Sequence, residues 1–131
     1  MRTLNWDYIA GFFDGEGNVN VPCGTSERSL QQPRVTIAQS GERGRVVLVE
    51  IAAFLQNKAG ISATVRPRSL VKPHHETAWI LHIGRRVDVV RFLTEMRGRV
   101  FVKKTATEDV LRYMIVFPST QRYAQQVKRT A

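Results

Sequence analysis

The segment 9–17, which reads IAGFFDGEG, places glycines inside a run of helix-forming apolar residues. On a helix that begins near Trp6, Gly11 and Gly15 lie on the same face, one turn apart. A glycine in a helix interior costs about 1 kcal/mol relative to alanine, so two of them at this spacing require a compensating contact. Close approach of another backbone would supply that contact, and we expect Ala10, Gly11 and Gly15 to form a flat strip for it.

Two carboxylates lie near the end of the same helix. Glu16 falls at its C-terminus, where the helix dipole disfavours an anion unless a cation, such as a divalent metal, neutralises it. The alternative is an amphipathic helix with Gly15 and Gly17 as ordinary stops, which leaves Gly11 unexplained. Asp14 cannot share the face of Glu16, so we expect a structural role for it as a hydrogen-bond acceptor.

The hydrophobic pattern downstream of this helix changes between two periods. Alternation of polar and apolar residues predicts strands, and helical spacing predicts helices. The expected strands are residues 18–21, 34–39, 63–68 and 77–83, and the expected helices are residues 5–15, 45–58, 87–96 and 107–117. Connections are expected at 22–33, 40–44 and 69–76. The order α-β-β-α-β-β-α-α predicts an α+β fold with helices on one face of a sheet.

The segment 9–17 resembles the motif of the LAGLIDADG homing endonucleases, and the order of elements extends the resemblance to about residue 117. It implies an αββαββα fold whose curved antiparallel sheet lies on duplex DNA, in one domain over 1–131 with a core at about 5–117 and a basic tail at 118–131. Members with a single motif act as homodimers, and this chain carries the motif once. Pairing would bring two copies of Glu16 together near a two-fold axis.

The resemblance also implies a metal centre. Glu16, where the family usually has aspartate, is the expected metal ligand, with the backbone carbonyl of Gly15 as a second one. Hard divalent cations bound by carboxylates assist phosphodiester hydrolysis. The expected cofactor is therefore Mg²⁺, or another hard cation such as Mn²⁺, or Ca²⁺ in a non-cleaving complex.

Three further side chains match family positions around that centre. Gln39 is the polar residue at the end of the second strand, and Arg43 is the basic residue shortly after it. Lys103 corresponds most closely to the family's lysine, although Lys104 is adjacent and the choice stays open. Their expected work is to order water and stabilise phosphate charge. Taken alone, Arg43 and Lys103 would be interpreted as solvated turn charges.

Alternation in the expected strands also separates a core face from an outer face. The outer set combines amides, guanidiniums, hydroxyls and small apolar groups, with no carboxylate: Asn18, Asn20, Arg34, Thr36, Thr64, Arg66, Arg68, Ala78, Ile80 and His82. Amides and guanidiniums read adenine and guanine edges, and alanine or isoleucine can meet a thymine methyl. We expect this face to contact DNA, although for Arg34 or His82 alone a merely basic solvent face is an equal alternative.

Composition limits the class of protein. Twenty Lys and Arg against eleven Asp and Glu give a net charge of +9, which favours polyanionic partners. A single cysteine, Cys23, excludes an intrachain disulfide, and three scattered histidines argue against a zinc site. No stretch reaches membrane-spanning length and the N-terminus lacks a signal or transit composition. We expect an intracellular protein with no membrane partner and no small-molecule substrate.

Three functional hypotheses follow. The first is a site-specific, metal-dependent homing endonuclease of the intron-encoded type, which acts as a homodimer and makes a double-strand break with short 3′ overhangs. The second is a non-catalytic LAGLIDADG-type protein that binds nucleic acid, as an RNA maturase or a DNA-binding regulator. The third, a basic RNA-binding protein of unrelated fold, is weakened by the lack of aromatic pairs for base stacking. Retention of Glu16, Gln39, Arg43 and Lys103 together favours the first.

Overall fold

The computed structural model describes residues 3–20, 33–68 and 76–116. Its elements are α1 (Trp6–Glu16), β1 (Gly17–Asn20), β2 (Arg34–Ser40), α2 (Gly41–Ala59), β3 (Thr64–Pro67), β4 (Ala78–Ile83), α3 (Arg86–Met96) and α4 (Lys104–Val116). The predicted order of helices and strands is confirmed. The expected loop around Cys23, most of the linker 69–76 and the basic tail lie outside the described residues.

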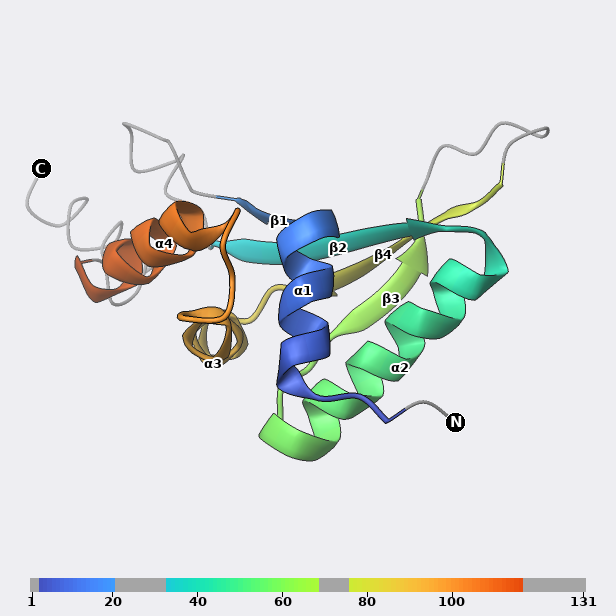
Figure 1. The fold of residues 1–131 in the computed structure, drawn as a ribbon, viewed down its shortest axis with the longest axis horizontal. Helices are drawn as coiled ribbons and strands as arrows, with labels where there is room; N and C mark the ends of the chain where they lie inside the picture. Colours follow the sequence, from blue (N-terminus) through green and yellow to red (C-terminus); the bar gives the residue numbers. More distant parts are fainter. Residues whose placement is uncertain (1–2, 21–32, 69–75, 117–131) are drawn as a thin grey trace, which may run out of the picture.

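The strands form one antiparallel sheet in the order β1-β2-β4-β3. In Figure 1, α1 crosses the strands between α2 and α3, and α4 lies beyond α3. The sheet side chains that are buried belong to the face that these helices cover. The predicted α+β fold with helices on one face is therefore confirmed. Among the described residues, no helix combines the length and apolarity needed to cross a membrane.

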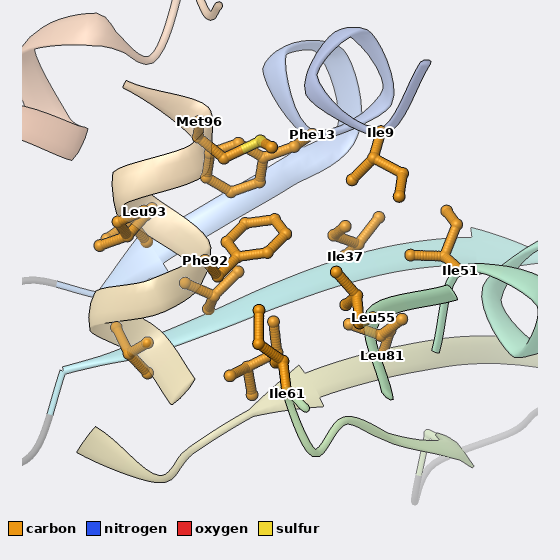
Figure 2. Packing of buried hydrophobic residues seen from close by; sticks show 14 of the residues in the cluster. Ile9, Phe13, Ile37, Ile51, Leu55, Ile61, Leu81, Phe92, Leu93 and Met96 are labelled. Atoms are coloured by element: carbon orange, nitrogen blue, oxygen red, sulfur yellow. The ribbon is translucent and has the colours of Figure 1, made fainter. Parts of the chain in front are cut away.

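The core lies between the helices and one face of the sheet, and α1 and α3 meet within it. Phe13 of α1 and Phe92 of α3 are fully buried, and their rings meet edge to face with centroids 5.2 Å apart. Figure 2 shows Met96 beside Phe13, and Ile37 of the sheet facing the same space. Aromatic pairs in this geometry contribute about 0.5–1.5 kcal/mol beyond the area they bury. This packing fixes α1 across the sheet.

Helix α1 runs from Trp6 to Glu16, within one residue of the expected range at each end. The side chain of Asn5 accepts a hydrogen bond from the backbone N–H of Tyr8 at 2.7 Å, which caps the N-terminus. At the other end the backbone N–H of Gly17 donates to the carbonyl of Phe13. Because Gly17 is also the first residue of β1, the motif helix passes directly into the sheet.

The turn predicted at 40–44 is wrong, because α2 begins at Gly41 and runs to Ala59. Gly41 has a φ of +78°, a backbone conformation that favours glycine, and its N–H donates to the carbonyl of Thr77 at 2.9 Å. Gly44 packs against Gln39, where an added Cβ would lie 2.7 Å from the Gln39 Cβ. Both glycines permit tertiary contacts in the first turns of the helix and do not interrupt it.

The apolar spacing of the expected helix 107–117 predicts that Val110, Leu111, Met114 and Ile115 face inward, and the structure differs on one of them. Val110 and Met114 of α4 are buried as expected. Ile115, expected to face inward with them, is 78% exposed. Adjacent helix positions differ by about 100° in direction, so Ile115 cannot share the buried face of Met114.

Candidate nucleic-acid interface

The outer face of the sheet is organised in rows that cross several strands. Thr36 of β2 lies opposite Asn18 of β1 and His82 of β4. His82 in turn lies opposite Thr64 of β3, so this row spans the whole sheet. Because side chains of one row point to one face, the four polar groups form a continuous line.

Neighbouring rows extend the same face. Ile80 lies opposite Ala38 and Arg66, and Asn20 lies opposite Arg34. The strand register therefore places nine of the ten predicted outer residues on one face, together with Ala38 and Ser40, which the sequence prediction did not include. The tenth, Arg68, follows the end of β3 and lines the hollow of that face. Continuing the alternation of β2 by two positions would have found both. That these residues contact DNA stays a prediction.

This face is hollowed and basic at its centre. Asn20, Arg34, Thr36, Arg66, Pro67, Arg68, Ile80 and His82 line a shallow, open hollow. Burial lowers the pKa of His82, and the positive charges of Arg66 and Arg34 lower it further. The described residues that line the hollow include no carboxylate. A polyanion would therefore meet several cations and a neutral imidazole there.

Glu16 and Gly15 lie at the junction between α1 and this sheet. Both are exposed, and Glu16 is the last residue of α1. Asn18 of the outer face follows two residues later on β1. The predicted metal ligands are thus fixed by the chain itself beside the first strand of the basic face.

The exposed strip of α1 is narrower than predicted. A Cβ built on Gly11 or on Gly15 meets no atom within 4 Å, so neither glycine is explained by a contact among the described residues. The prediction that Ala10 widens the strip is wrong, because Ala10 is only 2% exposed and packs with Ile9 and Phe13 in the core. Ala10 therefore faces its own sheet and cannot contact a second helix.

Lys103 is held at the C-terminal half of α1. Its Nζ donates to the backbone carbonyl of Asp14 at 3.0 Å, and its backbone N–H donates to the Asp14 carboxylate at 2.8 Å. The N–H of Phe101 donates to the other oxygen of that carboxylate at 3.1 Å. The predicted role of Asp14 as a structural acceptor is confirmed. Lys104, by contrast, is exposed at the start of α4.

Gln39 and Arg43 come together on the other side of α1. They line one hollow with Tyr8 and Phe12, and Phe12 lies one turn before Glu16. By the strand register, Gln39 belongs to the helix-bearing face of the sheet, opposite Trp79, and not to the basic outer face. Its side chain is confined there because α2 passes closely over it.

The predicted catalytic groups form no direct network within one chain. No hydrogen bond or ion pair among the described residues joins Glu16 to Gln39, Arg43 or Lys103. No group of three or more acidic, histidine or cysteine side chains that could hold a metal occurs there either. The metal ligands that the sequence predicts are the Glu16 carboxylate and the Gly15 carbonyl. These hard oxygens suit Mg²⁺ or Ca²⁺, which commonly complete their shells with water or phosphate.

No protein-family model and no curated protein matches the sequence. Several solved structures, however, are similar to this chain in their fold. The homing endonuclease I-CvuI, in complex with its target in the presence of Ca, superposes with a TM-score of 0.65 at 21% identity over 88% of this chain and 69% of that one. The homing endonuclease I-TnaI gives a TM-score of 0.63 at 24% identity over 89% and 76%.

The chain has the fold of the homing endonucleases. A second structure of I-CvuI, with a target of I-CreI and Mg in which the DNA is not cleaved, agrees at a TM-score of 0.62 and 20% identity over 88% of this chain and 69% of that one. The homing-endonuclease fold thus confirms the architecture that the motif implied, while the roles of individual side chains stay predictions.

Proposed function

We propose that this chain is a single-motif LAGLIDADG homing endonuclease that cuts both strands of a specific DNA duplex as a homodimer, with Mg²⁺. The observation that carries the proposal is the continuity of α1 with β1. This continuity fixes Glu16 beside a sheet face that is basic and whose described lining residues include no carboxylate. A duplex seated on that face would bring a phosphodiester toward the end of α1.

The homodimer in this proposal rests on α1. Gly11 and Gly15 leave one side of the helix without side chains, and a Cβ built on either would meet no atom of another described segment within 4 Å. A second copy of the same helix, related by a two-fold axis, fits a surface that lacks side chains. Each chain would contribute one Glu16, and the pair would serve the two strands. Short 3′ overhangs and intron homing belong to the same proposal by resemblance.

Glu16 and the Gly15 carbonyl would hold the metal in this mechanism. When bound, Mg²⁺ would neutralise phosphate charge and favour a nucleophilic water. Lys103 uses one of its donors on the Asp14 carbonyl, which leaves two to stabilise negative charge beside the end of α1. Gln39 and Arg43 would orient water from their shared hollow.

Selection of cleaved sites from a randomised duplex library with Mg²⁺ tests the proposal. We expect the wild type to cut one class of site and Glu16→Gln to bind that site without cutting it. Glu108→Gln on α4 is the matched control and should cut like the wild type. Cleavage by Glu16→Gln at the wild-type rate would remove the catalytic assignment. Binding without any cleavage by the wild type would favour the non-catalytic alternative.

A further inference from the structure

Gly84 directly follows β4, and a neighbouring side chain, not its own backbone conformation, explains why this residue is glycine. Its φ is not positive, unlike that of Gly41, Gly60 and Gly98, so its backbone conformation does not require glycine. A Cβ built at this position would lie 2.6 Å from Cε1 of His82, and 3.4 Å from Nδ1 and from Nε2. The imidazole of His82 therefore lies over Gly84 and occupies the space that any other residue would fill.

This imidazole lies in the interior of the basic face. His82 is on β4, between β2 and β3, and lies opposite Thr36 on one side and Thr64 on the other. It lines the central hollow together with Arg34 and Arg66. Gly84 directly follows the end of β4, and a Cβ built on it would point at this imidazole. Because Gly84 has no side chain, the imidazole can lie against the backbone, and it does not fill the hollow.

The chemistry of His82 differs from that of its cationic neighbours. Burial and the charges of Arg66 and Arg34 lower its pKa, so the neutral form prevails at pH 7. A neutral imidazole offers one N–H donor and one acceptor nitrogen, whereas a guanidinium only donates. Bases in the major groove present distinct patterns of donors and acceptors. A fixed imidazole can therefore distinguish base pairs that an arginine would not.

We propose that Gly84 is a positioning residue that determines sequence specificity, because it leaves the space in which His82 is oriented to read one base pair. The inference rests on the proposed DNA-binding function of the outer face and goes beyond it. A side chain at residue 84 would turn the imidazole away from the sheet and into the hollow. The arginines of the face would keep their contacts, so affinity would persist while the base preference at one step changed.

A double-mutant cycle tests the proposal. The wild type, Gly84→Ala, His82→Ala and the double variant are each used to select duplexes by binding, with Ca²⁺ in place of Mg²⁺. We expect Gly84→Ala to change the preference at one base-pair step in each half-site by roughly tenfold, in keeping with about 1–3 kcal/mol for a good base contact. His82→Ala should alter the same step. In that background Gly84→Ala should have no further effect, because the clash is gone.

The other outcomes are separable. A Gly84→Ala profile that superimposes on the wild type would overturn the inference, and so would a change that persists undiminished without the imidazole. A wild type that selects no duplex would overturn the proposed function and the inference with it.

If Gly84→Ala fails to fold, an NMR experiment on the wild type tests the inference instead. The NMR signal of His82 Cε1–H should move on adding the selected duplex, and much less with the base pair at that step exchanged. Equal movement with both duplexes would contradict the proposal.

Discussion

Asp14 and Lys103 are joined by two hydrogen bonds, and each residue takes part with its side chain in one and with its backbone in the other. The carboxylate of Asp14 accepts the backbone N–H of Lys103 at 2.8 Å, and Lys103 Nζ donates to the backbone carbonyl of Asp14 at 3.0 Å. Asp14 lies in α1 and Lys103 immediately precedes α4, so this pair fastens the α3–α4 connection to the motif helix. It also directs a lysine toward the end of α1 that carries Glu16.

Asp14 should make folding stability depend on pH in the acid range. Partial burial raises its pKa, but hydrogen bonds from the backbone N–H groups of Lys103, Val102 and Phe101, together with the Lys103 charge, lower it below 3.8 overall. Since the folded state holds the proton less tightly, the contribution is present above the unfolded pKa and is lost as pH falls through the folded one. Urea unfolding at several pH values should show this loss, and Asp14→Asn should reduce it. An unchanged pH profile in that variant would contradict the assignment.

Lys103 and Lys104 should differ in their effect on catalysis. Loss of a fixed electrostatic donor typically lowers the rate by about 10²–10³-fold, and Lys103 is the lysine fixed beside Asp14. We therefore expect Lys103→Met to cut slowly while it binds the duplex nearly as well as the wild type. Lys104→Met, changed at an exposed position, should retain most activity. Single-turnover cleavage rates measured beside affinities in Ca²⁺ would decide, and the reverse ranking would identify Lys104 as the active-site lysine.

Gly11→Val should prevent pairing of the chains without unfolding them. A Cβ at Gly11 meets nothing within 4 Å in the described chain, so the fold has room for it. A branched side chain on the bare strip would hold two copies of α1 apart. Light scattering should report a monomer for the variant and a dimer for the wild type, with similar circular dichroism. A variant that remains dimeric would place the interface elsewhere.

Gly17→Ala should destabilise the fold, in contrast to the same change at Gly11. An added Cβ at Gly17 would lie 2.2 Å from Cδ1 and 2.7 Å from the backbone oxygen of Phe13. Overpacking of this kind typically costs about 1–3 kcal/mol of unfolding free energy. Gly11→Ala, which removes a helical glycine in open space, should instead be neutral or stabilising by up to about 1 kcal/mol. Urea unfolding at low protein concentration compares the two variants directly.

The order of elements and the division of the sheet into two faces could be predicted because both follow from local periodicity. The start of α2 could not, because Gly41 and Gly44 look like a turn until their contacts with Thr77 and Gln39 are known. Ala10 was misplaced because a residue adjacent to Gly11 in sequence points about 100° away from it on a helix.

Contacts between segments that are distant in the sequence could not be predicted either. The pattern predicted that Asp14 accepts hydrogen bonds, but not that its donors come from Phe101 and Lys103, on the connection before α4. The space that Gly84 leaves for His82 has no periodic signal either. A glycine two residues after a histidine on an outer strand face is nevertheless a local clue that could be sought in other sequences of this fold.

Under the proposed function, the alternation of the strands also limits how target preference can diverge. Point changes on the outer face, at Thr36 or Arg66 for example, leave the buried partners Val35 and Ile37 untouched. Recognition can therefore drift one base pair at a time at little cost in folding. An inserted or deleted residue within β2 would instead exchange its two faces, bury a guanidinium and bring an isoleucine to the surface. New targets should arise through substitution within the strands, with changes of length confined to the connections.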